Sequence, residues 1–294
     1  MSTSKNEQTM QLPDGRTLGY AEFGKPEGVP LFYFHSLPGS RLEAQIIDIY
    51  ESEINTRLVG VDRPGMGLSD YQPQRQLLDW PDDVTELAES LEINKFGVLG
   101  LSGGGPHALS CAYKIPERVT ACGVVSSIGP PEISNAGMSS LNRIFLSLSK
   151  HLMPLTRFML WLMVGRHSQD EEKLEEYFLN MSQKVPEPER KIMEDPELLR
   201  PAIKATKDAL RQGSKGMAYE MTLFSSPWGF QLEDISVKNM FLWHGELDEN
   251  VPVSMGKAMA KSLPNCQATF YPREAHLSTI VNHVGEIMTA ITSV

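Results

Sequence analysis

The sequence of 294 residues has only three cysteines and no dense cluster of Lys and Arg, and both shortages narrow the range of functions. Cys111, Cys122 and Cys266 form an odd, widely spaced set that offers neither a disulfide framework nor the ligand spacing of a zinc site. We therefore expect no metal, and a reducing compartment such as the cytoplasm. The net charge of −10 disfavours nucleic-acid binding, because phosphate contacts need clustered positive charge.

Long apolar runs are also missing. The first ten residues, MSTSKNEQTM, are polar and lack the apolar core of a signal peptide, so we expect none. The most apolar stretch outside the expected strands runs from Phe158 to Val164, whereas a bilayer span takes about 20 residues. We interpret this stretch as part of a helix that covers something apolar, and we expect no membrane span.

The most informative stretch reads FGVLGLSGGGPH, from Phe96 to His107. It begins as a short apolar run typical of a buried strand, and a helical pattern follows it from Pro106 to Ile115. Between them, residues 100–104 fit G-x-S-x-G, the nucleophile elbow, in which a serine occupies a strained turn between strand and helix. A glycine-rich turn with an incidental serine is the alternative, but the order strand, turn, helix favours Ser102 as a nucleophile.

Strand and helix patterns alternate through the first 130 residues. A hairpin is expected around the turn Pro13-Asp14-Gly15, and a further turn or loop follows each later strand. The expected strands are Thr9–Leu12, Arg16–Phe23, Pro30–Phe34, Leu58–Val61, Phe96–Leu99, Ala121–Ser127, Asn239–Trp243 and Ala268–Tyr271. The expected core helices are Leu42–Ile54, Trp80–Leu91, Pro106–Ile115 and Leu277–Ile291. Such alternation predicts an α/β fold with a mostly parallel sheet flanked by helices.

The alternation stops at Gly129-Pro130-Pro131 and resumes near Asn239. Residues 131–229 carry helical patterns and almost no strand signal, so they predict an inserted helical cap, or lid, on a core formed by residues 1–130 and 230–294. A separate helical domain is the alternative. Two parts of the lid, Leu141–Val164 and Met217–Phe224, are rich in Leu, Met and Phe and are expected to supply an apolar pocket.

A serine nucleophile needs a histidine to accept its proton and an acid to orient that histidine. Asp248 follows the strand that ends at Trp243, and His276 follows the last strand, 28 residues further on. The chain order Ser, Asp, His is that of a catalytic triad in an α/β-hydrolase. Glu246 is the rival acid, and we prefer Asp248 because it reaches further past the strand. Of the seven histidines, only His276 is expected in a loop directly after the final strand.

These residues carry a resemblance to the α/β-hydrolase superfamily, in its branch of capped, cofactor-free, esterase-like enzymes. The matching motifs are residues 35–40 (HSLPGS), 62–69 (DRPGMGLS), 100–104 (GLSGG) and 245–248 (GELD), with His276. The resemblance implies an oxyanion hole formed by the backbone N–H groups of Leu37 and Gly103. The family usually has His-Gly where this chain has His35-Ser36, and residues 62–69 are expected only to brace a turn beside the site.

We therefore predict a serine esterase that cleaves a small or medium carboxylic ester, with a thioester or lactone as variants, through an acyl-enzyme. Two alternatives stay open. One is another triad activity, such as peptide-end cleavage, carbon–carbon bond hydrolysis or lyase chemistry. The other is a receptor or signalling protein of the same fold with slow turnover, because fold alone does not fix function. A free-amine substrate would need a carboxylate in the cap, and Glu171, Glu172, Glu175 and Glu176 look like a solvated helix face. The oligomeric state is left open.

Overall fold

A computed structural model describes residues 6–50 and 55–293 of the chain. Its centre is an eight-stranded sheet in the order β1-β2-β4-β3-β5-β6-β7-β8. The strands are β1 Gln8–Gln11, β2 Thr17–Gly24, β3 Val29–Phe34, β4 Thr56–Val61, β5 Phe96–Leu101, β6 Val119–Val125, β7 Met240–Gly245 and β8 Cys266–Tyr271. The pairs β1–β2 and β2–β4 are antiparallel and all the other pairs are parallel, so the predicted mostly parallel sheet is confirmed.

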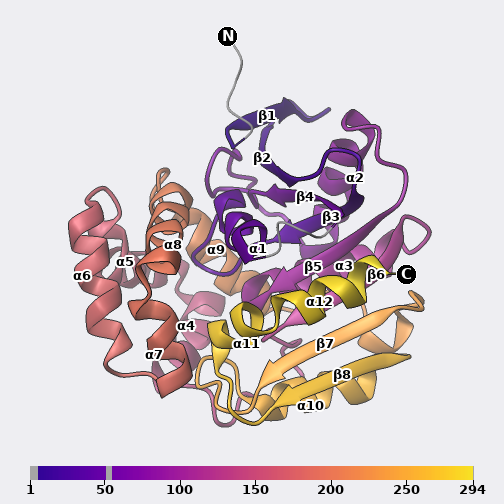
Figure 1. Cartoon of the computed structure of the whole chain (residues 1–294). Helices are drawn as coiled ribbons and strands as arrows, with labels where there is room; N and C mark the ends of the chain where they lie inside the picture. Colours follow the sequence, from indigo (N-terminus) through magenta and orange to yellow (C-terminus); the bar gives the residue numbers. More distant parts are fainter. Residues whose placement is uncertain (1–5, 51–54, 294) are drawn as a thin grey trace.

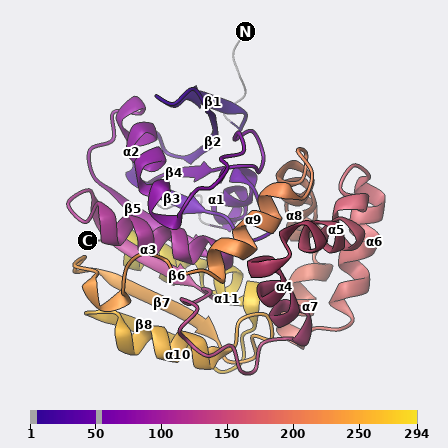
Figure 2. The ribbon, with the colours of Figure 1, turned by 180° about the vertical axis from the view of Figure 1, so that it is seen from behind.

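Helices cover both faces of this sheet. In Figure 1, α1, α11 and α12 lie in front of the strands, and Figure 2 shows α2, α3 and α10 in front of the opposite face. These core helices are α1 Ala44–Tyr50, α2 Trp80–Ser90, α3 Gly105–Lys114, α10 Val253–Ser262, α11 His276–Asn282 and α12 Val284–Thr292. The expected helix Leu42–Ile54 starts as a 3₁₀ turn and continues as α1, while its end, residues 51–54, lies outside the described residues.

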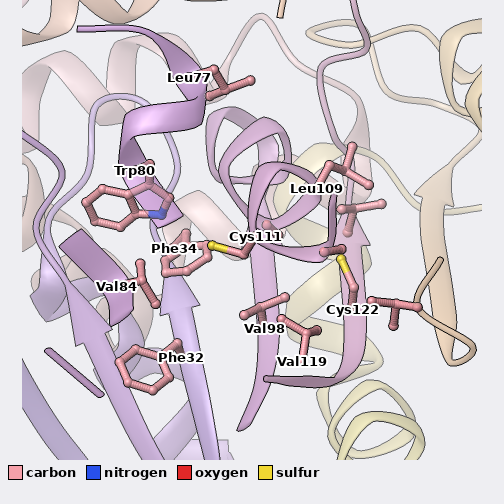
Figure 3. Close-up of a cluster of buried hydrophobic side chains, with 14 of the residues drawn as sticks. Phe32, Phe34, Leu77, Trp80, Val84, Val98, Leu109, Cys111, Val119 and Cys122 are labelled. Atoms are coloured by element: carbon pink, nitrogen blue, oxygen red, sulfur yellow. The ribbon is translucent and has the colours of Figure 1, made fainter. Parts of the chain in front are cut away.

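The two faces of the sheet carry separate apolar cores because successive side chains of a strand point to opposite faces. Phe32 and Phe34 of β3 pack on the α2–α3 side, where the Phe34 ring meets Trp80 edge-on at 5.3 Å between centroids. Figure 3 shows this cluster, with Val98 of β5 at its centre. Leu31, the neighbour of Phe32, packs on the opposite side against α1, α11 and α12. A sheet buried on both faces explains why its strands read as continuous apolar runs.

Between β6 and β7 every regular element of the described chain is helical. The inserted helices are α4 Ser140–His151, α5 Met153–Met163, α6 Glu171–Ser182, α7 Glu187–Glu194, α8 Pro196–Ala209 and α9 Lys215–Phe224. They share a small apolar core that includes Phe145, Leu160, Leu174 and Ile203. In Figure 1 they lie to the left of the sheet, on the side to which the arrowheads of β7 and β8 point. None of the described helices is long and apolar enough to cross a membrane.

One expected element differs from the structure. The single closing helix Leu277–Ile291 is wrong, because the chain forms α11 and α12 with a break at His283. The ring of His283 stacks on Tyr271 at 3.7 Å between centroids, and its Nε2 lies 3.4 Å from a Glu274 oxygen. His283 thus contacts the end of β8 and the loop after it, and its backbone is non-helical. Apolar periodicity continues through the break, so it gives no sign of it.

Candidate active site

Ser102 stands at the end of β5, where the chain turns sharply into α3. Its φ is +80°, in the left-handed region that L-residues rarely adopt. Close approach of two backbones explains one of the neighbouring glycines: a Cβ on Gly104 would lie 2.0 Å from the carbonyl oxygen of Phe34. A side chain there would push α3 away from β3 and shift the serine. The strained turn therefore presents the Ser102 side chain, 8% exposed, at the edge of the sheet.

The structure brings together the three side chains that the sequence singled out, from the ends of three strands. Oγ of Ser102 lies 2.9 Å from Nε2 of His276, and Nδ1 of His276 lies 2.7 Å from Oδ2 of Asp248. A carboxylate only accepts hydrogen bonds, so Nδ1 carries the proton, Nε2 is the acceptor, and the serine hydroxyl donates to it. One difference is local: His276 is the first residue of α11 rather than a loop residue.

Asp248 is held so that one oxygen faces the histidine. Its Oδ1 accepts the backbone N–H groups of Asn250 and Val251, each at 2.9 Å, and this leaves Oδ2 for His276. The rival acid, Glu246, lies just beyond the end of β7 and instead pairs with Lys257 at 3.0 Å, where both side chains are exposed. The geometry therefore gives Asp248 alone of these two a contact with the imidazole.

His276 differs electrostatically from the other buried histidines. Burial lowers its pKa, but the charge and hydrogen bond of Asp248, with the nearby Glu189 and Glu43, outweigh burial and raise the pKa above 6.5. Burial lowers the pKa of His107 to about 4 and lowers those of His35 and His244 as well. Of these four imidazoles, His276 is the one whose environment stabilises an added proton.

Glu189 of α7, in the helical insertion, reaches the first turn of α11. Its Oε2 accepts the backbone N–H of Leu277 at 2.8 Å and that of Ser278 at 3.2 Å, immediately after His276. On the other side, the Ser126 hydroxyl donates to the His276 carbonyl at 3.1 Å. Sequence reasoning missed Glu189, because it lies in an acid-rich stretch typical of an exposed helix, yet only 3% of it is exposed.

These contacts predict the pH dependence of turnover. Only the neutral imidazole accepts the serine proton, so kcat/KM should fall as the pH drops through the raised pKa of His276, with a midpoint above 6.5. Glu189→Gln removes one of the charges that raise this pKa, so it should move the midpoint to lower pH. Glu171→Gln, an exposed carboxylate paired with Lys207, is the matched control and should leave the profile in place. If Glu189→Gln leaves the midpoint unchanged, Glu189 does not contribute to the raised pKa of His276.

The two backbone segments expected to bind an oxyanion lie side by side. A Cβ on Gly103 would be 3.1 Å from the Cβ of Leu37 and 3.1 Å from the ring of Phe224. Gly103, directly after the serine, therefore lies against the loop after β3. Leu37 and Ser102 also line the same cavity. The role of their N–H groups as oxyanion donors stays a prediction.

Arg63 holds the loop that carries Leu37 from one side. Its Nη1 donates to the carbonyl oxygen of His35. Its Nη2 donates to the carbonyl oxygen of Ser36 at 3.2 Å. Its Nε donates to Glu220 of α9 at 2.8 Å, and both side chains are fully buried. Burial opposes ionisation of Glu220, but Arg63 with His107 and Arg75 holds its pKa well below the ordinary value. A buried ion pair between the insertion and the core thus anchors the two residues before Leu37.

Glu43 holds the same loop from the other side. Its carboxylate accepts the Ser36 N–H at 2.8 Å, the Ser36 hydroxyl at 2.5 Å and the Tyr33 hydroxyl at 2.6 Å. Ser36 does not have a positive φ. A serine at the position where α/β-hydrolases usually have glycine therefore needs no left-handed backbone here. Its hydroxyl gives Glu43 an additional hydrogen bond that glycine lacks. Burial raises the pKa of Glu43 despite these donors.

The motif at residues 62–69 braces a turn, as expected. Oδ2 of Asp62 accepts the Leu68 N–H at 2.8 Å and the guanidinium of Arg41 at 2.8 Å. Arg41 also reaches Asp208 of α8 at 2.5 Å, so this brace ties the insertion to the core. Burial raises the pKa of Asp62 to about 6.

A cavity of about 350 Å³ opens beside Ser102 and His276. The two lid stretches chosen from the sequence contribute Leu146, Leu160, Met163, Val164, Met217 and Met221 to its wall. A third part of the wall, which sequence reasoning did not predict, comes from α6, α7 and α8 and includes Phe178, Ile192 and Leu199. The volume is in the range of small-molecule sites, and its wall is mainly apolar with a few polar groups. Among residues 6–50 and 55–293, no group of His, Cys, Asp and Glu is placed to hold a metal ion.

Comparison with characterised sequences gives relatives over part of the chain. The dihydrolipoyllysine-residue acetyltransferase component of the acetoin cleaving system of Pseudomonas putida is 32% identical over 122 residues, which cover 41% of this chain and 33% of that protein. The proline iminopeptidase of Neisseria gonorrhoeae is 29% identical over 113 residues, 37% of this chain and 36% of that protein. The matches thus span about a third of each relative's length. No family model matches the sequence.

Comparison with solved structures covers nearly the whole chain. An esterase from Exiguobacterium antarcticum superposes with a TM-score of 0.71 at 18% identity, over 98% of each chain. An alpha/beta hydrolase fold protein from Nakamurella multipartita superposes with a TM-score of 0.72 at 18% identity, over 98% of this chain and 99% of that one. This likeness over nearly the whole chain shows that the chain has the α/β-hydrolase fold.

Proposed function

We propose that this chain, with its α/β-hydrolase fold, is a serine hydrolase that cleaves a small or medium carboxylic ester, a thioester or lactone being variants of the same chemistry. The observation that carries the proposal is the hydrogen-bonded chain Ser102–His276–Asp248 at the wall of an apolar cavity. Residues 1–130 and 230–294 are the core in this proposal, and residues 131–229 are the lid. Its place is the cytoplasm, in keeping with three free cysteines of which two are buried.

The proposed mechanism has two halves. Oγ of Ser102 attacks the ester carbonyl while Nε2 of His276 takes the hydroxyl proton, and the carbonyl oxygen becomes an oxyanion held by the N–H groups of Leu37 and Gly103. The imidazolium then protonates the leaving alcohol as the C–O bond breaks, which leaves an acyl group on Ser102. Water attacks this acyl-enzyme while His276 takes its proton, and the imidazolium then returns a proton to Oγ of Ser102 as the acyl–Oγ bond breaks and the carboxylic acid departs. Asp248 keeps the imidazole in the required tautomer throughout.

The apolar cavity predicts a preference for longer acyl chains. Each additional methylene buried under the lid contributes about 0.8 kcal/mol, or roughly fourfold in kcat/KM. A panel of p-nitrophenyl esters of increasing acyl length should therefore show rising kcat/KM until the cavity is full, with Ser102→Ala as the background. A flat response across short and medium chains would contradict an apolar acyl pocket under the lid.

Peptide-end cleavage is the second candidate, because Glu189 gives the cavity the cap carboxylate that a free-amine substrate would need. Two backbone N–H groups already occupy Oε2 of Glu189, and burial raises the pKa of its carboxyl, which weakens it as an ammonium partner. We therefore favour the ester. The p-nitroanilide of proline, assayed beside the ester panel, distinguishes the two, and a higher kcat/KM for the anilide would favour the peptidase. Binding of a ligand with no turnover of either substrate would favour the receptor.

A further inference from the structure

Large apolar side chains are concentrated on the outside of α4 and α5. Of the ten large hydrophobic residues that are exposed in the described chain, seven lie within residues 141–162, each 38% to 53% exposed. We call this surface the α4–α5 face, and its members are Leu141, Ile144, Leu152, Leu155, Phe158, Trp161 and Leu162. Seven exposed large apolar side chains on two consecutive helices and their link indicate an interaction surface, because large exposed apolar areas on soluble chains are typically binding sites.

The same two helices are apolar on their inner sides. Leu146 of α4 and Leu160 and Met163 of α5 line the cavity beside Ser102. On the outer side, Leu155, Phe158 and Leu162 recur at helical spacing, and the Phe158 and Trp161 rings stack at 6.1 Å between centroids. The stretch Phe158–Val164 is interpreted from the sequence as covering something apolar. In the structure its inner side covers the cavity, and its outer side is exposed. The helix α5, which is apolar apart from Thr156 and Arg157, is therefore expected to be covered on its outer side as well.

Charge distinguishes the possible occupants of this surface. Residues 140–169 contain Arg143, Lys150, Arg157 and Arg166 and no Asp or Glu, whereas the whole chain has a net charge of −10. All four cations are exposed, and none is in a salt bridge with another described residue. A second copy docked on the same face would bring like charges together. An anionic surface would neutralise them.

We propose that the α4–α5 face docks on an anionic lipid surface, with both helices lying in the plane of the headgroups. Interfacial helices combine Trp, Phe and Leu on one side with Lys and Arg at the polar boundary, and this segment has that composition. The polar boundary is supplied by the four cations, which anionic headgroups attract. Docking on lipid does not depend on ester turnover. A further consequence, that an apolar ester enters the cavity from the lipid, rests on the proposed function.

The fluorescence of Trp161 can report the docking. Of its four tryptophans, Trp161 is 46% exposed, while Trp80, Trp228 and Trp243 are at most 3% exposed. Vesicles of phosphatidylcholine with 30% phosphatidylserine should shift the tryptophan emission of the unaltered chain to shorter wavelength. Trp161→Phe should abolish the shift while the protein still sediments with the vesicles. The emission shift is measured on the unaltered chain, so this result does not depend on whether a variant folds.

Vesicle co-sedimentation measures the affinity. Phe158→Ser with Leu162→Ser should weaken partitioning at least tenfold, and so should Lys150→Glu with Arg157→Glu, which acts on the charge alone. Ile49→Ser on α1, 44% exposed and outside the face, is the matched control and should change nothing. Binding should fall when the ionic strength is raised to 0.5 M, because salt screens exposed charges.

Three outcomes would overturn the proposal. The first is absence of both the emission shift and sedimentation with anionic vesicles. The second is equal binding to pure phosphatidylcholine vesicles without dependence on salt, which removes the role of the cations. The third is a dimer in analytical ultracentrifugation that Phe158→Ser dissociates, because a second copy then covers the face. None of these outcomes bears on soluble-ester turnover, so failure of the docking is distinguishable from failure of the hydrolase.

Discussion

Ser102→Ala and His276→Ala are each expected to remove nearly all ester turnover, a loss on the order of 10⁶ in kcat for a triad that acts as one unit. Without Oγ there is no nucleophile for the carbonyl carbon. Without the imidazole the hydroxyl, whose proton His276 Nε2 would accept across 2.9 Å, stays protonated and is a poor nucleophile. The measurement is kcat on the best p-nitrophenyl ester, after circular dichroism has shown that each variant is folded.

The double variant tests whether the two residues act together. If they form a single unit, Ser102→Ala with His276→Ala should be little worse than either single change, because the second substitution removes a group that no longer has a partner. His283→Ala, at a histidine outside the cavity wall, should keep most of the activity. A serine-directed phosphonate should label Ser102 in the unaltered chain and fail in His276→Ala. Substantial turnover by Ser102→Ala would reject this serine as the nucleophile.

The parts of the fold that the sequence predicts are those that local patterns encode. Buried strands read as short apolar runs, helices as a 3.6-residue periodicity, and the turn at Pro13-Asp14-Gly15 as a hairpin, which the pairing of Gln11 with Thr17 confirms. The neighbourhood of Ser102, Asp248 and His276 follows from the same information. Each residue comes just after a parallel strand, and the carboxyl ends of parallel strands meet at one edge of the sheet.

The contacts between the helical insertion and the rest of the chain could not be predicted, because they join residues that are far apart in the sequence. Glu189 and Leu277 are 88 residues apart in the chain, and Arg63 and Glu220 are 157 apart. Glu189 lies in an acid-rich stretch typical of a solvated helix, and Glu220 is a single carboxylate within an apolar stretch. Neither pattern shows which core residue the carboxylate meets. The contribution of α6 to α8 to the cavity was missed for the same reason: an amphipathic pattern shows that a helix has an inner face, without showing what that face meets.

Lid and core are therefore linked close to each part of the proposed machinery. Glu189 of α7 binds the turn after His276, and Glu220 of α9 neutralises Arg63, which holds the carbonyls of His35 and Ser36 before Leu37. A displacement of the helical insertion would disturb both His276, the proposed base, and the loop that carries Leu37. Docking of α4 and α5 on lipid would thus act on the same structural unit that positions these groups.

Asp248→Asn is expected to lower kcat by a factor on the order of 10⁴ while leaving the shape of the site intact. The two N–H groups of Asn250 and Val251 donate to the Oδ1 position, so the oxygen of the new amide should stay there and its NH₂ should take the Oδ2 position, 2.7 Å from Nδ1 of His276. An NH₂ group donates, so Nδ1 must then accept, and the imidazole proton moves to Nε2. In that tautomer Nε2 has no lone pair for the Ser102 proton, and the developing imidazolium has lost its counter-charge. Glu246→Gln changes the same functional group two residues earlier, where the carboxylate pairs with Lys257, and should cost far less. Near-normal kcat in Asp248→Asn together with loss of activity in Glu246→Gln would transfer the role of the acid to Glu246.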